Sequence, residues 1–239
     1  MQMKIKTFFS SFWDIYSVAY DIIGKIDPHA RMDNRVASIL LKMFNGTFLD
    51  AGCGTASLIQ TIISKSKHCK IFGIDVSKGM LSIASRKFRA TNKVKLLHAD
   101  LNAPLPFPNE FFDGIACVHV INYLSNPRQV CTEFHRILKK GGILVLVSFI
   151  KKLNFNKFMK HYRDLIREYG KKHGIKAFFL IFFFIIILAC NLPIKIGYGI
   201  KYYNEEKIDE LMTNLNFNKI FSERTYADHS ILICYEKEK

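Results

Sequence analysis

Short apolar runs alternate with segments in which apolar residues recur at every third or fourth position, from about residue 47 to residue 150. The short runs predict buried strands, and the three-to-four spacing predicts helices. This alternation indicates an open, largely parallel α/β sheet. The first strand leads into Asp50, and the next four are expected at 70–75, 94–99, 112–118 and 143–149.

Helices are expected before and between these strands. The pattern of residues 1–46 predicts helical structure, with a break at Asp27-Pro28 because the residue before proline disfavours the helical conformation. Ser77 is placed to cap the helix that follows the second strand. A further helix is expected near Asn126–Lys139 and should end at Gly141-Gly142.

The last forty or so residues follow a different pattern. A helix is expected at Glu205–Leu215, followed by strands at Asn218–Glu223 and Ile231–Tyr235. The connection between these strands is too short for a crossover helix, so the pair should form an antiparallel hairpin. The predicted fold is a Rossmann-like, mostly parallel seven-stranded sheet with helices on both faces. Its ending is unlike that of a nicotinamide dehydrogenase, which would repeat the βαβαβ unit.

Residues 151–202 form an insertion that is far longer than the connection requires. Its first half combines a helical apolar stripe with nine basic and two acidic residues between Lys151 and Lys176. A basic amphipathic helix of this kind is typical of membrane-surface binding. The following run, Ala177–Cys190, is apolar throughout but shorter than the roughly 20 residues that a spanning helix needs.

A single membrane crossing by this run would place the last helix and the hairpin on the opposite side from the sheet that they complete. We therefore predict an interfacial or re-entrant segment, with residues 151–194 contacting an anionic membrane surface. The alternatives are a buried core helix, a lid over a lipophilic pocket and a homodimer contact. The expected location is cytoplasmic, peripheral or monotopic on the inner face of a membrane.

Composition supports this prediction without deciding it. The net charge of +15 favours anionic surroundings, but no aromatic and basic recognition strand is visible, so no nucleic-acid partner is expected. The six cysteines are scattered, which favours a reducing compartment and predicts neither a disulfide framework nor a metal site. Asp14 interrupts the apolar N-terminal stretch and no cleavage site follows, so no signal peptide is expected.

Candidate chemistry gathers where the first strand turns into a helix through Gly52 and Gly54. Glycines allow a tight bend and a close approach by a ligand, and a helix N-terminus offers free N–H groups. Asp75 ends the second strand about 20 residues later, where a nucleotide-binding fold places a carboxylate for ribose hydroxyls. Asp100 follows the third strand in the same way. Solvated turn acids are the alternative, but the carboxyl ends of parallel strands favour a ligand site.

Taken together, these segments resemble the class I S-adenosylmethionine-dependent methyltransferases, in the type 11 group that includes quinone-biosynthesis and phospholipid N-methyltransferases. The resemblance is strong over residues 13–150 and architectural over 203–236. It rests on the motifs Leu49–Thr55, Gly73–Asp75, Ala99–Leu101, Leu105–Phe107 and Arg136–Gly142. It implies a single domain over 1–239, with a helical lid at 1–46, a cofactor-binding core at 47–150, the insertion at 151–202, and the last helix and hairpin at 203–239.

The resemblance also implies roles for individual residues. Gly52 and Gly54 would meet the methionine part of S-adenosylmethionine, and Asp50 would help to hold its amino end. Asp75 would bind the ribose, and Asp100 would contact the adenine. The complete set of expected cofactor contacts is Tyr20, Asp50, Gly52, Gly54, Asp75, Val76, Asp100, Leu101 and His119. One departure is Ala56, which stands where many relatives have a third glycine.

The chemistry requires mainly that the acceptor is aligned with the methyl carbon and that water is excluded. A hydroxyl acceptor also benefits from a general base. His119 lies where the family places groups that face the sulfonium, so it is the first candidate for this base, and Tyr123 is the second. His119 could instead only shape the pocket, and Tyr16, Tyr20 or Tyr123 could offer a cation–π contact.

The sequence therefore predicts a methyltransferase that acts on a small lipophilic acceptor at the membrane surface. A quinone precursor, a phospholipid headgroup and a lipophilic natural product would all fit. One alternative is a soluble small-molecule methyltransferase whose insertion is a lid or a dimer interface. The other is a membrane-tethered protein that binds the cofactor without catalysis.

Overall fold

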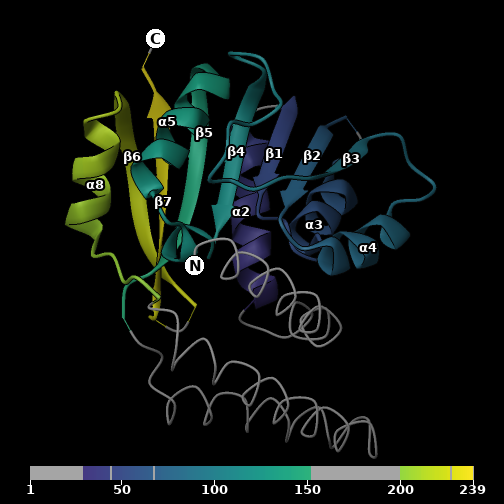
Figure 1. Ribbon diagram of the computed structural model, residues 1–239, viewed down its shortest axis with the longest axis horizontal. Helices are drawn as coiled ribbons and strands as arrows, with labels where there is room; N and C mark the ends of the chain where they lie inside the picture. Colours follow the sequence, from purple (N-terminus) through teal and green to yellow (C-terminus); the bar gives the residue numbers. More distant parts are fainter. Residues whose placement is uncertain (1–28, 44, 67, 152–199, 227, 239) are drawn as a thin grey trace, which may run out of the picture.

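A seven-stranded sheet in the order β3-β2-β1-β4-β5-β7-β6 forms the centre of the protein (Figure 1). The computed structural model describes residues 29–43, 45–66, 68–151, 200–226 and 228–238. The described helices are α2 (His29–Met43), α3 (Ser57–Lys65), α4 (Lys78–Lys87), the short 3-10 helix η1 (Ile121–Tyr123), α5 (Pro127–Ile137) and α8 (Glu205–Thr213). The strands are β1 (Thr47–Ala51), β2 (Lys70–Asp75), β3 (Val94–His98), β4 (Phe112–Val118), β5 (Leu138–Phe149), β6 (Phe217–Thr225) and β7 (Ser230–Lys237).

The first five strands run parallel, as the sequence predicts. β1 lies in the middle and pairs with β2 on one side and with β4 on the other. From β1 the chain builds outward to β3, then returns to the opposite side of β1 to add β4 and β5. In such sheets the reversal leaves a crevice at the carboxyl ends of the two central strands, where ligands bind. The loops that follow β1 and β4 are therefore the first place to look for a site.

The C-terminal hairpin is also confirmed. β7 pairs antiparallel with β6, and it enters the sheet between β6 and β5, where it is antiparallel to β5 as well. Both strands are longer than the sequence pattern suggests, because their pairing continues to Thr225 opposite Ser230. α8 is shorter than expected and ends at Thr213 rather than Leu215.

Helices cover both faces of the sheet. One apolar cluster packs α5 and α8 against Leu144 and Leu146 of β5. The other packs α2, α3 and α4 against a face that includes Val145 and Val147 of the same strand. Successive side chains of β5 thus point to opposite layers, which explains why this strand is apolar at every position from Ile143 to Val147.

The junction of α5 and β5 differs from the sequence prediction. The helix ends at Ile137, and the strand begins at Leu138 rather than at residue 143. Leu138 pairs with Phe112, and the register then shifts before Gly114 pairs with Ile143. Gly141, expected to end the helix, instead has a φ of +70° inside this irregular start of the strand. A glycine can serve either purpose, so the sequence does not distinguish a helix stop from a strand bulge.

Two predicted regions fall partly or wholly outside the described residues. The N-terminal lid is described only from residue 29 onward, so Tyr16 and Tyr20 lie outside the description. The basic and apolar segments of the insertion lie within 152–199 and are likewise outside it. Among the helices that are described, none has the length and apolar character needed to cross a bilayer.

Candidate functional site

The glycine turn after β1 is held by the neighbouring strand. The backbone N–H groups of Gly52 and Cys53 both donate to the carbonyl of Ile74, at 2.8 and 2.9 Å. Gly52 has a φ of +80°, and a Cβ at this position would lie 2.4 Å from Cγ2 of Val120. Both the backbone conformation and the contact therefore require glycine here. Val120 follows β4, so this contact joins the loops of the two central strands.

Ala56 occupies a left-handed conformation at the N-cap of α3. Its φ is +64°, its side chain is fully buried, and the cap has no side-chain hydrogen bond. A left-handed conformation costs a residue with a Cβ roughly 1–2 kcal/mol. The position where the family resemblance places a third glycine thus keeps the glycine conformation although it carries an alanine.

Asp75 ties the end of β2 to the glycine turn. Its Oδ2 accepts from the backbone N–H of Gly54 at 2.8 Å, and its Oδ1 accepts from that of Ser77 at 2.8 Å. Burial raises the pKa of this carboxyl, while the hydrogen bonds from Ser77 and Gly54 act in the opposite direction. Ser77 caps α4 as expected, because its Oγ accepts from the N–H of Met80. Each carboxylate oxygen keeps a second lone pair that can accept from a ligand hydroxyl.

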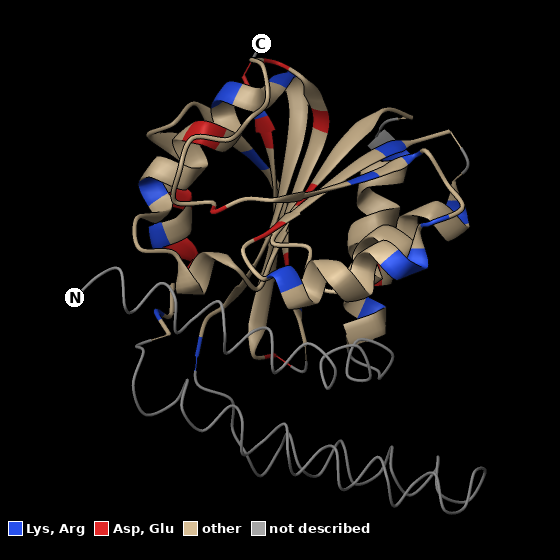
Figure 2. Cartoon of the chain, turned by 45° about the vertical axis from the view of Figure 1, so that its right-hand side comes forward, with Lys and Arg blue, Asp and Glu red and all other residues tan. Residues whose placement is uncertain are grey.

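Asp50 interacts with Asp75 and with a third carboxyl, that of Asp33. Asp50, at the end of β1, is 4 % exposed, and burial together with the charges of Asp33 and Asp75 raises its pKa well above the usual range. Asp33 comes from α2, is 2 % exposed, and was not singled out from the sequence. Burial raises its pKa to about 7, against a hydrogen bond from the Ser57 side chain and the charge of Lys87. Figure 2 shows red segments, which mark Asp and Glu, on strands of the sheet as well as on the helices.

The structure places the other expected cofactor residues at the ends of β2 and β3. Val76 is 38 % exposed, whereas Leu101 is buried. The N–H of Ala99 donates to the carbonyl of Asp75 at 3.1 Å, which joins the two strand ends. Asp100 uses Oδ1 to accept from both the backbone and the side-chain nitrogen of Asn102, each at 2.9 Å. Val76, Leu101 and Asp100 therefore lie at the same edge of the sheet as Asp75.

His119 lies at the other end of this edge, directly after β4. Its φ is +57°, and its ring stacks on that of Phe149 with the centroids 4.0 Å apart. Its Nε2 lies 2.8 Å from Oγ of Ser230. Burial, assisted by His29, lowers the pKa of His119 well below its usual value, so the imidazole is neutral. The ring of Tyr226 meets it edge-on at 4.9 Å.

Tyr123 is not one of the ring contacts of His119 within the part of the chain that the structure describes; those rings belong to His29, Phe149 and Tyr226. Tyr123 ends η1, and its backbone N–H donates to the carbonyl of Val120 at 2.9 Å. The two expected catalytic residues thus belong to one loop, and only His119 lies in the ring cluster.

Asn122 is an unexpected organising residue of the same loop. Its Nδ2 donates to the carbonyls of Phe149 at 3.0 Å and Lys201 at 2.7 Å, and its Oδ1 accepts from the N–H of Phe149 at 3.0 Å. The N–H of Lys201 in turn donates to the carbonyl of Asn122 at 3.1 Å. Asn122, which is 1 % exposed, therefore joins the chain just before the insertion to the last residues of the insertion. A lone asparagine offers no sequence signal for this role.

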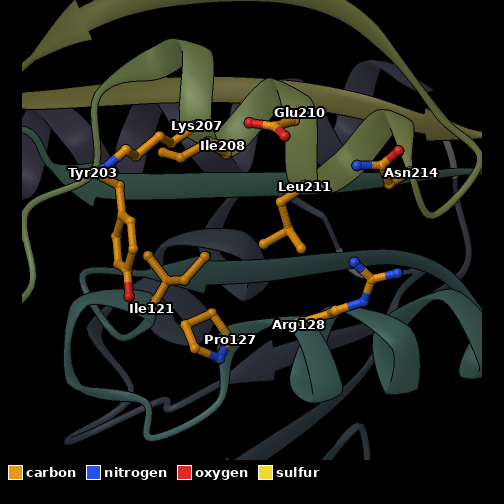
Figure 3. Close-up of a pocket in the computed structure, with 9 residues that line it drawn as sticks. All are labelled: Ile121, Pro127, Arg128, Tyr203, Lys207, Ile208, Glu210, Leu211 and Asn214. Atoms are coloured by element: carbon orange, nitrogen blue, oxygen red, sulfur yellow. The ribbon is translucent and has the colours of Figure 1, made fainter.

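A cavity of about 340 Å³ lies between α5 and α8, away from the glycine turn (Figure 3). None of the expected cofactor residues lines it. Its walls are largely apolar, with charged side chains among them, and consist of Ile121, Pro127, Arg128, Tyr203, Lys207, Ile208, Glu210, Leu211 and Asn214. It therefore belongs to the packing of α8 rather than to the candidate site.

Comparison with known proteins points in the same direction as this geometry. Residues 49–146 match the family profile described as "Methyltransferase domain". The chain is 26% identical over 170 residues to the malonyl-[acyl-carrier protein] O-methyltransferase of Paenibacillus sp. (strain JDR-2), a match that covers 64% of this chain and 61% of that protein. It is 28% identical over 134 residues to the demethylmenaquinone methyltransferase of Thermus thermophilus, covering 54% and 60%. The chain thus spans about three fifths of the length of these curated relatives.

Solved structures share the whole fold at low identity. The magnesium protoporphyrin IX methyltransferase from Synechocystis PCC 6803, solved with bound SAH, superposes with a TM-score of 0.67 at 14% identity, and the match covers 100% of both chains. A SAM-dependent methyltransferase from Aquifex aeolicus gives a TM-score of 0.61 at 16% identity, covering 91% of this chain and 97% of that one. These likenesses show the fold.

Proposed function

We propose that this chain, whose residues 49–146 match the methyltransferase domain profile, is a class I S-adenosylmethionine-dependent methyltransferase that transfers a methyl group from this cofactor to a small lipophilic acceptor. The observation that carries the proposal is the Asp75 carboxylate, held by the N–H groups of Gly54 and Ser77 beside the glycine turn. This arrangement fixes an acceptor of hydroxyl hydrogen bonds at the switch point of the sheet.

The residues of the turn fit the cofactor. Gly52 allows the turn to pack directly against Val120 in the loop after β4, because a Cβ would lie 2.4 Å from Cγ2 of Val120. The Oγ1 of Thr55, in the same turn, is buried and has no hydrogen-bond partner within the described part of the chain. In the proposed arrangement the turn receives the methionine part, Asp75 the ribose, and Asp100 with Leu101 the adenine. When bound, the cofactor supplies a methyl group that its sulfonium has already activated.

The ring cluster around His119 supports a role on the acceptor side. Stacking on Phe149 and the contact with Ser230 fix the orientation of the imidazole, and burial keeps it neutral. Donation from Nε2 to Ser230 leaves Nδ1 with the lone pair that can accept a proton from an acceptor hydroxyl. The same rings exclude water from this end of the site. In this proposal His119 acts as the base, and Tyr123 shapes the adjoining loop.

The lipophilic acceptor and the membrane surface are proposed from the insertion. Asn122 binds Phe149 just before it and Lys201 near its end, and Phe149 is the residue on which His119 stacks. Both ends of the insertion are thus attached close to His119. The relatives cited above are named for different acceptors, malonyl-[acyl-carrier protein] and demethylmenaquinone, so likeness to them does not choose between acceptors. A basic and apolar segment at this point suits a membrane-borne lipophile.

The test uses the full chain with methyl-labelled S-adenosylmethionine and a total extract of its own cells. Label in the organic phase is expected for the wild type and should be lost in His119→Ala. Label confined to the aqueous phase would favour a soluble small-molecule enzyme. Bound cofactor without transfer to any fraction would favour a non-catalytic, membrane-tethered binder.

Flotation tests the membrane partner separately. The full chain should float with vesicles that contain anionic lipid and should be released when Lys157, Lys160, Arg163 and Arg167 are changed to Gln. Each basic residue near such a surface contributes about 1 kcal/mol. Replacing Arg86, Arg89, Lys139 and Lys140, which lie outside the insertion, is the matched control and should leave flotation unchanged. No flotation, together with a dimeric mass, would point to the insertion as a dimer interface.

A further inference from the structure

An acidic side chain lies on the apolar face of α2, outside the segment that matches the methyltransferase family. Asp33 is 2 % exposed, and its helical neighbours Met32, Val36 and Ala37 are fully buried. A carboxyl in this position loses its hydration, which is unfavourable unless a partner or a function compensates for it. The position is therefore unusual enough to require an explanation.

The surroundings of Asp33 connect it to the glycine turn. It is hydrogen-bonded to the side chain of Ser57, the first residue of α3. From the opposite direction, Nζ of Lys87 in α4 donates to the carbonyl of Thr55 at 2.8 Å. Helices α2 and α4 thus both contact the short segment between β1 and α3. The buried Oγ1 of Thr55, without a partner in the described chain, lies in this same segment.

The charged and titratable groups around Asp33 come from three elements. Asp50 of β1 is buried and interacts with Asp33 on one side and with Asp75 of β2 on the other, and Lys87 of α4 is the cation near Asp33. Lys87 already donates to Thr55. Burial raises the pKa of Asp33 to about 7, against the hydrogen bond with Ser57 and the charge of Lys87. Because the carboxyls interact, the protons belong to the cluster as a whole.

We propose that Asp33 is a positioning residue of the cofactor site, which holds the glycine turn through Ser57 and, with Asp50, recognises the ammonium group at the methionine end of the cofactor. The proposal rests on the proposed function. Binding of the ammonium favours the ionised carboxyls, so the cluster gives up a proton to solvent as the ion pair forms. The methionine end is then selected by charge from α2 as well as by the backbone of the turn.

The proposal predicts how cofactor affinity depends on pH. Below pH 7 the free cluster holds an extra proton that binding must release, so affinity should rise from pH 6 to pH 7.5. For one carboxyl with a pKa of about 7 the increase is roughly eightfold. The buried imidazoles do not titrate in this range, because burial lowers the pKa of His29 to about 4 and that of His119 further still.

The probe that separates the two ends of the cofactor is 5′-methylthioadenosine, which keeps the adenosine and lacks the ammonium. Calorimetry of the full chain with each ligand, at pH 6 and pH 7.5 and in two buffers of different ionisation heat, gives the affinities and the protons released. S-Adenosylmethionine should bind more tightly at the higher pH and release protons. Methylthioadenosine should do neither, although it contacts the same Asp75.

Asp33→Asn should remove the pH dependence and the proton release for S-adenosylmethionine, weaken it at least about tenfold at pH 7.5, and leave methylthioadenosine unchanged. Glu223→Gln is the matched control. It breaks the ion pair that Arg35 of the same helix makes with β6, at 2.7 Å, and should affect neither ligand.

The proposal would be overturned if the wild type showed equal pH dependence for both ligands, a result that needs no variant to fold. It would also fail if Asp33→Asn kept the wild-type pH dependence. Failure of both ligands to bind the wild type would instead overturn the proposed function on which it rests.

Discussion

The two ends of the candidate site are built in different ways. At the ends of β1 and β2 the site is held mainly by backbone hydrogen bonds. Asp75 accepts from two backbone N–H groups, and the glycine turn donates to the carbonyl of Ile74. Where β4 and β5 end and β7 begins, the site is held by side-chain contacts, because His119 packs against Phe149 and Tyr226 and lies within hydrogen-bond distance of Ser230. The first end is local in sequence, and the second is assembled from distant segments.

The two ends also differ in their titratable groups, which are acidic at the first end and basic at the second. Burial raises the pKa of the Asp33 and Asp50 carboxyls, and it lowers that of the His29 and His119 imidazoles. The same physical cause, desolvation, therefore disfavours the charged form of both kinds of group. A cationic ligand favours ionisation of the carboxyls at the first end, whereas the second end offers the lone pair of a neutral imidazole. This contrast suits a reaction in which one end holds a cation and the other accepts a proton.

The largest expected effect comes from the backbone end. Gly52→Ala places a Cβ in a left-handed conformation and 2.4 Å from Val120 Cγ2. Strain of about 1–2 kcal/mol and overpacking of about 1–3 kcal/mol should lower the free energy of unfolding by roughly 2–5 kcal/mol. Chemical denaturation measures this loss. Adding Val120→Ala should recover only the overpacking part, and a full recovery would contradict the assigned backbone strain.

The next effect tests the imidazole end. His29 has a pKa of about 4 when folded and about 6.5 when unfolded, so its contribution is complete above pH 6.5 and is lost as the pH falls toward 4. The shift corresponds to about 3 kcal/mol. The pKa of Asp33 is raised in the folded state, so its contribution to the free energy of unfolding changes in the opposite direction over the same pH range. This contribution cancels when a variant at His29 is compared with the wild type, because both proteins contain Asp33.

The free energy of unfolding of His29→Phe should therefore rise relative to that of the wild type by about 3 kcal/mol as the pH falls from 7 to 4. Denaturant unfolding at each pH measures this difference. His68→Phe, an exposed histidine, is the control and should leave the pH profile unchanged. A constant difference between His29→Phe and the wild type across this range would contradict the neutral, buried imidazole.

Asn122→Ala should have an intermediate effect and should separate the two ends functionally. It leaves the part-buried carbonyls of Phe149 and Lys201 without this donor, at a cost of about 1–3 kcal/mol in the free energy of unfolding. Turnover should fall while the affinity for S-adenosylmethionine stays within about twofold of the wild type. Asn126→Ala, which removes the cap of α5, is a control of similar structural cost. A parallel loss of cofactor affinity would show that the two ends are not separable.

The smallest expected effect is a gain. Ala56→Gly should raise the free energy of unfolding by about 1 kcal/mol, because glycine adopts the φ of +64° without the Cβ penalty. Ala37→Gly in the regular part of α2 is the reciprocal control and should destabilise by about 1 kcal/mol. Destabilisation by Ala56→Gly would mean that the buried methyl group contributes more than its backbone strain costs.

The contrast between the two ends explains what the sequence reveals. The glycine turn, Asp75, Val76 and Leu101 follow strands at regular spacings, so local patterns locate them. The parallel order and the hairpin follow from strand–helix alternation and from loop length in the same way.

The sequence could not show contacts that join distant segments. Asn122 is a single polar residue whose partners are 27 and 79 positions away. Asp33 lies three residues before Val36, in line with the apolar stripe of α2. This position indicates a buried carboxyl only when the elements that pack against the stripe are known. Tyr226 reaches His119 only because the hairpin returns to β5. Such residues can be identified only from the packing of the folded chain, because their spacing in the sequence carries no signal.

The position of β7 has a consequence for biosynthesis. β5 is fully apolar from Ile143 to Val147, and in the described part of the chain its outer edge pairs with β7, whose Ser230 faces Phe149 across 81 positions of sequence. At about 5–20 residues per second, a ribosome needs roughly 4–16 s to deliver that partner. During this interval the edge of β5 is an open template for pairing with other chains. The nascent protein therefore passes through a state in which an unpaired sheet edge and the emerging apolar insertion are exposed together, and both favour early capture by a chaperone or a lipid surface.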